Sequence, residues 1–208
     1  MAATGSVRTD GTLLSRLDQF LFKIETVFCL IGGLAVFSLM ILAVISVTGR
    51  HLFNQPLSGY VDWIEIIMPV IAFLGISFSQ RLGGHIRMDI LIMNLKGRPL
   101  WIVEIISSII ILLLILLLLW GSWAHFQRSF DLSAPLWSRD SSVDIGLPIW
   151  PAKLIVPLAF FILVMRLVLQ IWGYARAIYE GSDEPVAVPL PEGAAELAAA
   201  EAKIVSEK

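Results

Sequence analysis

Charged residues and cysteine are both scarce in this sequence. Only 15% of its 208 residues are charged, whereas soluble domains carry about a quarter. The single cysteine, Cys29, excludes an intrachain disulfide framework and a cysteine pair for redox exchange. A net charge of −2 argues against a nucleic-acid partner. The chain therefore has neither the surface charge of a soluble protein nor the positive charge of a nucleic-acid-binding protein.

Motifs for catalysis and metal binding are also absent from the sequence. It has no P-loop, no HExxH pair and no metal-spaced cluster of cysteine and histidine. The three histidines, His51, His85 and His125, lie outside the apolar runs or at their edges, so they do not form the buried pair that a haem site needs. We therefore expect no enzyme activity, no cofactor and no bound metal.

Long apolar runs are what the sequence has in abundance. Hydrophobic residues make up 57% of the chain, and its mean hydropathy is +0.82. A helix needs about 20 apolar residues to cross the hydrocarbon core of a bilayer. Runs of this length predict four spanning helices, at about 27–48, 61–80, 101–124 and 152–174. The expected fold is an all-α integral membrane protein.

The sequence outside the spans indicates how the chain is organised. Residues 1–12 are expected to be a flexible N-terminus, 13–176 the four-helix membrane domain, and 177–208 a mobile tail, because prolines and alternating Ala-rich and charged residues replace the apolar runs there. Residues 13–28 carry apolar residues at helical spacing with charges among them. This pattern predicts an amphipathic lead-in helix at the membrane interface. A plain extension of the first spanning helix into water fits the pattern equally well.

Lysine and arginine in the connections indicate the orientation of the chain. On one side they gather before the first span, between the second and third spans, and after the fourth. These residues are Arg8, Arg16 and Lys23, then Arg81, Arg87, Lys96 and Arg98, and finally Arg176. On the other side are Arg50, Arg128, Arg139 and Lys153, and aspartates oppose the last three. The bias predicts that both termini lie in the cytoplasm.

A few residues inside or near the spans are candidates for contacts between helices. Glu104 lies about one turn into the third span and Arg166 about two turns from the end of the fourth, so the two are able to pair. In the alternative, each side chain extends separately to its own membrane face. Pro69 and Gly75 in the second span, and Pro157 in the fourth, are candidate kinks.

The most distinctive stretch covers the end of the second span and the connection after it. Residues 72–91 read AFLGISFSQRLGGHIRMDIL. Gly83 and Gly84 predict a turn, after which His85, Arg87 and Asp89 alternate with apolar residues. This spacing suits a short interfacial segment with one wet side. A lone histidine in such a turn is more often a structural group than a metal ligand.

This stretch and its surroundings resemble the small membrane subunit (DctQ-like) of the tripartite ATP-independent periplasmic transporters, the TRAP family. The resemblance covers roughly residues 15–175. It is carried by Arg50 at the end of the first span, Trp63 and Glu65 at the start of the second, Arg81, Gly83, Gly84, His85, Arg87 and Asp89 after it, and Leu147-Pro148-Ile149-Trp150 leading into a fourth span with Lys153, Pro157 and Gln170.

The resemblance implies a role as well as a fold. Small subunits of this family have four spans and lie beside a much larger multi-span subunit that holds the substrate and sodium sites. A soluble periplasmic binding protein delivers the solute, typically an organic acid, and a sodium gradient drives import without ATP. The resemblance therefore implies a non-catalytic scaffold subunit in the bacterial inner membrane, whose partners are the large subunit, the binding protein and membrane lipids.

Two other classes of protein stay open at this stage. An autonomous homo-oligomeric carrier or channel would associate with itself and would use intramembrane polar residues such as Ser38 or Ser77 for flux. A membrane enzyme or redox protein would carry haem, quinone or metal on purification. The identity of the solute is not encoded in a scaffold subunit, since the other two components would select it.

Overall fold

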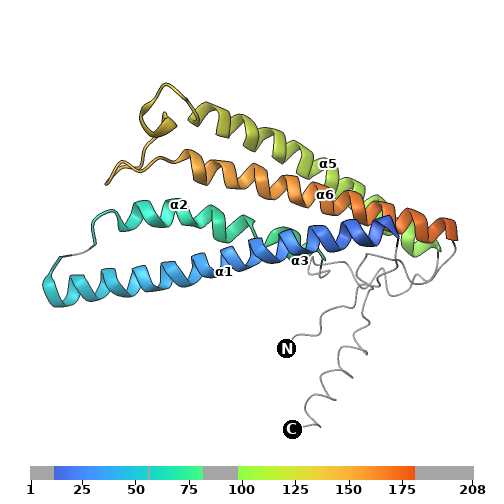
Figure 1. Cartoon of the computed structure of the whole chain (residues 1–208), viewed down its shortest axis with the longest axis horizontal. Helices are drawn as coiled ribbons and strands as arrows, with labels where there is room; N and C mark the ends of the chain where they lie inside the picture. The colour runs from blue at the N-terminus through green and yellow to red at the C-terminus, as the bar shows by residue number, and fades with distance from the viewer. Residues whose placement is uncertain (1–11, 56, 82–97, 181–208) are drawn as a thin grey trace, which may run out of the picture. The chain divides into compact units, whose positions relative to one another are not determined.

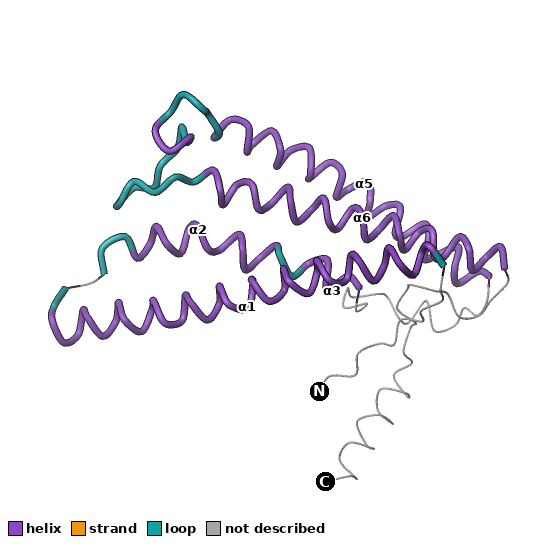
Figure 2. Tube along the Cα trace, in the orientation of Figure 1, coloured by secondary structure: helices purple, strands orange, loops and turns teal. Residues whose placement is uncertain are grey.

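The computed structural model describes residues 12–55, 57–81 and 98–180. Helices account for most of these residues (Figures 1 and 2). They are α1 (Leu13–Phe53), α2 (Tyr60–Phe73), α3 (Ile76–Arg81), α5 (Arg98–Ser129), a short 3-10 helix at Pro135–Trp137, and α6 (Trp150–Glu180). The described ranges contain no β-strand beyond isolated bridges. The prediction of an all-α fold is confirmed.

Four helical stretches are long and apolar enough to cross a bilayer, which confirms the four predicted spans. They are Leu13–Phe53, Tyr60–Arg81, Pro99–Ser129 and Trp150–Tyr179. Each contains the range expected from the sequence and continues past it. These extensions are physically reasonable, because a helix that starts inside the hydrocarbon layer must emerge from it before its terminal backbone groups meet water.

The second spanning stretch is interrupted at Leu74 and Gly75, where α2 ends and α3 begins. Pro69 lies inside α2 without ending it. Of the two candidate kinks in this span, Gly75 is therefore at the break, where a residue without a Cβ lowers the cost of leaving helical geometry. The interruption places Ser77 and Arg81 on a separate short helix.

The amphipathic segment before the first span forms one helix with it. α1 runs without interruption from Leu13 to Phe53, so the lead-in segment is continuous with the first spanning helix. Large apolar residues of this segment are exposed, with Leu13 71% and Phe20 64% exposed, while Leu14 and Asp18 are 2% and 1% exposed. The carboxylate of Asp18, which an interfacial helix would turn toward water, therefore faces the interior of the protein.

Contacts divide the chain into two compact units. Among the described residues, unit 1 contains 12–20, 79–81, 98–112 and 165–180. Its apolar cluster consists of four buried residues from α5 and α6, namely Leu100, Trp101, Tyr174 and Ala177. The rings of Trp101 and Tyr174 stack with their centroids 5.8 Å apart. Trp101 is thus buried within the protein.

Among the described residues, unit 2 contains 21–55, 57–78 and 113–164. Aromatic pairs join its helices. Phe73 of α2 packs edge-on against Phe160 of α6 with ring centroids 5.4 Å apart, and Phe22 of α1 stacks on Phe78 of α3 at 6.2 Å. Such pairs contribute about 0.5–1.5 kcal/mol each beyond their buried area. They fix α2 and α3 against the longer helices of the unit.

The segment that joins α5 to α6, residues 130–149, consists mainly of loops and turns around the short 3-10 helix (Figure 2). Two isolated bridges, Phe130 with Ser138 and Ser141 with Pro148, fold it back on itself. Leu136 and Trp137 have positive φ values of 54° and 57°. Residues other than glycine adopt this left-handed region at a cost in free energy, so surrounding contacts must hold the segment in place.

Gly59, which precedes α2, provides a test of this packing. Its φ is +74°, and a Cβ added there would lie 2.5 Å from Cδ1 and 2.8 Å from Cγ2 of Ile145. We expect Gly59→Ala to lower the free energy of unfolding by about 1–3 kcal/mol through overpacking and backbone strain. Thermal unfolding of the purified protein measures this. Gly121→Ala is the control, because a Cβ there meets nothing within 4 Å. Equal melting of the two variants would contradict the packing.

Candidate functional site

A buried carboxylate binds two arginines in unit 1. Arg81 Nη2 donates to Asp18 Oδ2 at 2.8 Å, and Arg166 Nη1 donates to Asp18 Oδ1 at 2.5 Å. The side chains of Asp18, Arg81 and Arg166 are only 1%, 10% and 0% exposed. One carboxylate therefore joins α1, α3 and α6. We call these three residues the Asp18 cluster.

Burial makes the Asp18 cluster energetically important. A charge taken out of water costs several kcal/mol, and only good pairing geometry offsets that cost. Removing one partner from such a pair costs about 3–5 kcal/mol, because an uncompensated charge stays buried. The cluster thus ties three helices together strongly once it has formed, although a purely apolar packing of the same volume can be equally stable.

Neutral and acidic side chains extend these contacts within unit 1. Gln80 Nε2 donates to Gln170 Oε1 at 2.9 Å, which joins α3 to α6. The Tyr174 hydroxyl donates to Glu104 Oε2 at 3.4 Å, which joins α6 to α5. In a membrane, polar side chains that hydrogen-bond each other across helices hold the helices together where apolar contact alone is not selective.

The residues of the predicted Glu104–Arg166 pair are both buried, 6% and 0% exposed. The expectation that Arg166 extends to the membrane face by itself is therefore wrong, because its guanidinium is held inside by Asp18. Glu104 accepts the hydrogen bond of Tyr174. A direct contact between Glu104 and Arg166 stays a prediction.

In unit 2, Asp62 anchors the 130–149 segment to the start of α2. Its carboxylate, in a residue only 2% exposed, accepts hydrogen bonds from Ser142 Oγ at 2.6 Å and from the backbone N–H groups of Asp144 and Ile145 at 3.1 and 2.7 Å. Ser142 Oγ in turn accepts the backbone N–H of Leu147 at 2.8 Å. These bonds add to the backbone hydrogen bonds within the segment and hold it against α2.

A second anchor joins the segment to the helices on either side of it. Lys153 Nζ at the start of α6 donates to Asp140 Oδ2 at 2.6 Å, and Ser129 Oγ at the end of α5 donates to the same oxygen at 2.5 Å. The hydrogen bond from Lys153, followed by that from Ser129, lowers the pKa of Asp140 below its ordinary value. Hydrogen bonds from Ser133 and then Arg139 lower the pKa of Asp131 to about 2.

Several residues that carried the family resemblance lie in unit 2. Arg50 lines a cleft of about 240 Å³ together with Tyr60 and Asp144. Glu65 lines another cleft, of about 200 Å³, together with His125, Lys153 and other residues. Trp63 is 42% exposed, as an indole at a membrane surface would be. The turn residues Gly83, Gly84, His85, Arg87 and Asp89 lie outside the described residues.

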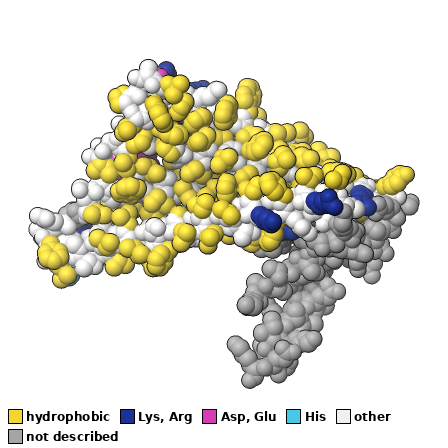
Figure 3. Space-filling model, in the orientation of Figure 1, with side chains coloured by type: hydrophobic (Ala, Val, Ile, Leu, Met, Phe, Trp, Pro, Cys, Tyr) yellow, Lys and Arg dark blue, Asp and Glu magenta, His cyan; other side chains and the backbone are white. Residues whose placement is uncertain are grey.

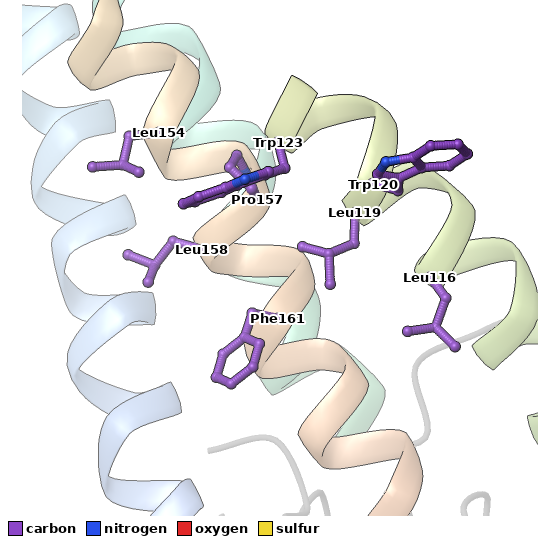
Figure 4. A pocket seen from close by; sticks show the side chains of 8 residues that line it. All are labelled: Leu116, Leu119, Trp120, Trp123, Leu154, Pro157, Leu158 and Phe161. Atoms are coloured by element: carbon purple, nitrogen blue, oxygen red, sulfur yellow. The ribbon is translucent and has the colours of Figure 1, made fainter. Parts of the chain in front are cut away.

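Pro157 lies inside α6 and does not end it. It lines an apolar groove of about 440 Å³ formed by residues of α5 and α6, which Trp123 of α5 also lines (Figure 4). The groove opens at the surface of unit 2, because Trp120 and Phe161 at its edge are 73% and 53% exposed. Pro157 thus shapes a packing surface, as expected for most prolines in membrane helices.

Comparison with known families decides what kind of protein carries these features. The model of the DctQ component of tripartite ATP-independent periplasmic transporters matches residues 39–177, about two-thirds of the chain. The chain belongs to the DctQ family. It is thus a membrane component of a TRAP transporter, as the resemblance implied. No curated protein matches the chain in the corresponding sequence comparison.

The DctQ match contains most of the anchoring residues but not all of them. Arg81 and Arg166 lie inside residues 39–177, whereas Asp18 precedes them. Asp18 was not among the residues predicted from the sequence, although its spacing relative to neighbouring apolar residues could have indicated its burial. Asp18 and Glu25 follow Leu14 and Leu21 at the spacing of one helical stripe, and all four residues are buried. Glu25 Oε1 accepts a hydrogen bond from Ser77 at 2.6 Å.

The Asp18 cluster predicts which second substitution restores the stability of a charge-reversal variant of Arg166. Arg166→Glu would bring two carboxylates together and should sharply reduce the yield of folded protein. Adding Asp18→Arg restores opposite charges at this contact and should recover part of the yield and of the melting temperature. Size-exclusion chromatography and thermal unfolding measure both. The exposed Arg16, changed to Glu, is the control.

A rescue by Glu104→Arg instead of Asp18→Arg would show that Arg166 pairs with Glu104 in the membrane. If neither second change helps while Arg16→Glu is harmless, the buried contact between Asp18 and Arg166 is contradicted.

The carboxylates that anchor the 130–149 segment predict that the stability of this segment depends on pH. The pKa values of Asp131 and Asp140 are lowered in the folded chain, so their contribution to stability is complete above the ordinary value of 3.8. It is lost as the pH falls toward about 2, where Asp131 becomes protonated. Near-ultraviolet circular dichroism of the aromatic residues should therefore stay constant from pH 7 to about 5 and change below about 4.

Asp131→Asn should remove the part of this acid transition that Asp131 contributes, whereas Asp144→Asn should leave it unchanged, because Asp144 donates to Asp62 through its backbone only. A transition already complete at about pH 5 would contradict the assignment.

Proposed function

We propose that this DctQ-family chain is the non-catalytic scaffold subunit of a TRAP importer in a bacterial inner membrane. A large multi-span subunit beside it carries an organic acid across the membrane, and a periplasmic binding protein delivers that acid. A sodium gradient drives the movement. The chain itself binds no solute and supplies a fixed surface for the large subunit.

The observation that carries the proposal is the exposed apolar surface of α1 and α5. In the most apolar 18-residue stretch of α1 only 6% of the residues are buried within the chain. The corresponding share is 17% in α5 and 50% in α6. Leu34, Phe37 and Val44 of α1 are each at least half exposed. Hydrophobic side chains also cover much of the face visible in Figure 3. Lipid or another membrane protein must cover this surface.

The allocation of the charged residues also supports a scaffold. Charges inside membrane proteins usually mark substrate or ion pathways. Here the buried ones bind each other or the chain: Asp18 holds two arginines, Glu25 holds Ser77, and Asp62 holds the 130–149 segment. The middle of α1, from Thr26 to Gly49, has no charged residue. The charged groups are thus used to fix helices.

The direction of the chain in the membrane belongs to the same proposal. The excess of lysine and arginine before the first span, in the second connection and after the fourth span favours cytoplasmic termini. In that orientation the 130–149 segment faces the periplasm, where the binding protein arrives. The double anchoring of this segment by Asp62 and Asp140 suits a surface that must stay in place while other parts move.

Reconstitution tests the proposal directly. Liposomes that contain the large subunit and this chain should take up the organic acid only when the binding protein and an inward sodium gradient are present. Replacing sodium by potassium, or omitting this chain, should reduce uptake to background. Uptake catalysed by this chain alone would contradict the scaffold and support the autonomous carrier.

A variant separates a scaffold from a substrate-binding subunit. Arg166→Met removes a buried charge partner and should lower the maximal rate several-fold by reducing the number of assembled transporters, with an unchanged KM for the delivered solute. Arg16→Gln, at an exposed position of the same chain, should change neither quantity. A raised KM in Arg166→Met would contradict the assignment of this residue to the scaffold.

A further inference from the structure

Arg50 carries the family resemblance but has no part in the anchors described above. It lies in the last turn of α1 and is exposed. In the described part of the chain, its guanidinium has no ion-pair partner within 4 Å. Its cleft, of about 240 Å³, is also lined by the hydroxyl-bearing residues Ser46 and Tyr60. A cation beside two hydroxyl groups is suited to bind an anionic oxygen such as that of a phosphate.

The same cleft contains the opposite charge. Asp144 lines it, and the backbone N–H of Asp144 is held by Asp62 at 3.1 Å, which fixes the position of the residue. In the described chain its carboxylate makes no salt bridge, to Arg50 or to any other residue. Two opposite charges thus border one space without neutralising each other, which leaves both available to a ligand that carries both signs.

The remaining lining of the cleft is apolar and connects it to the membrane surface of the chain. Val47 and Val61 are 66% and 62% exposed, and Leu57 is 39% exposed. Val44, almost one turn before Val47 in α1, is 60% exposed. A charged headgroup in the cleft would therefore have a continuous hydrocarbon surface beside it for its chains. A water-soluble zwitterion would leave that surface uncovered.

We propose that this cleft binds the headgroup of a zwitterionic phospholipid that carries a primary ammonium. Arg50 and the hydroxyls of Tyr60 and Ser46 bind the phosphate, Asp144 binds the ammonium, and the acyl chains lie along Val44, Val47 and Val61. The depth suits such a ligand, since the cleft lies where the first spanning helix ends and the second begins. The site is independent of the transported solute.

Native mass spectrometry of the purified, delipidated full-length chain tests the proposal with three dioleoyl lipids. Phosphatidylethanolamine should bind about tenfold more tightly than phosphatidylglycerol, which lacks the ammonium and is repelled by Asp144. It should also bind several-fold more tightly than phosphatidylcholine, whose quaternary ammonium donates no hydrogen bond. Soluble phosphoethanolamine should compete only weakly, because it gains no contact with the valines. Equal binding of all three lipids would overturn the proposal.

Three variants assign the two charges. Arg50→Gln should weaken phosphatidylethanolamine about tenfold, while Arg128→Gln, in the corresponding last turn of α5, should have no effect. Asp144→Asn should weaken phosphatidylethanolamine and strengthen phosphatidylglycerol, which reverses or abolishes the preference. Thermal unfolding verifies that each variant is folded. An unchanged preference in Asp144→Asn, or equal effects of Arg50→Gln and Arg128→Gln, would overturn the site.

The assembled transporter distinguishes lipid from protein in this cleft. If the large subunit occupies it, a photo-crosslinker at Leu57 will attach to that subunit, and no phosphatidylethanolamine will be retained on release of the chain from the complex. That result contradicts the lipid site and leaves the scaffold proposal intact. Crosslinking to lipid supports the site.

Discussion

The carboxylate of Asp18, buried between two arginines, is the contact on which the arrangement of unit 1 depends. Three helices that are far apart in sequence meet there, and the cost of an unpaired buried charge penalises any arrangement in which they do not. Leucine and isoleucine cannot supply such a penalty in a membrane, because lipid tails solvate them as well as neighbouring helices do. The few charges of this chain therefore specify its helix packing.

The same principle operates at the 130–149 segment of unit 2. Asp62 and Asp140 hold it by hydrogen bonds from backbone and side-chain donors, and two of its residues other than glycine, Leu136 and Trp137, have positive φ values. Strained backbone persists only where neighbouring contacts determine it. A segment fixed in this way fits the static part of a tripartite transporter, whose other membrane subunit is proposed to do the moving. The exposed apolar faces of α1 and α5 then meet lipid or that subunit.

Part of this account could be predicted from the sequence. Long apolar runs with few charges are sufficient to predict four spans, since a helix of that length satisfies its own backbone groups in hydrocarbon. Of the two candidate kinks in the second span, Pro69 and Gly75, the break lies at Gly75. The residues from Arg50 to Pro157 indicated the family. Asp18 was missed because charges at helical spacing near an N-terminus also fit an interfacial helix. The pattern gives the period of a helix but not which side of it meets protein.

Asp62 illustrates a second limit of the sequence. In the sequence it lies near Glu65, yet its partners are the Ser142 hydroxyl and the backbone N–H groups of Asp144 and Ile145, which come eighty or more residues later. Backbone donors are the same at every position, so no sequence pattern marks them. The pairing of Glu104 with Arg166 was proposed from depth alone, and depth does not distinguish between two carboxylates at similar levels. Only the three-dimensional contact identified Asp18 as a partner.

A double-mutant cycle between Asp18→Asn and Arg166→Gln tests the central claim most directly. Free energies of unfolding of the wild type, the two single variants and the double variant give the coupling between the two side chains. The account predicts that the double variant is more stable than the sum of the single effects implies, by at least about 1.5 kcal/mol. Effects that add to within about 0.5 kcal/mol would contradict it.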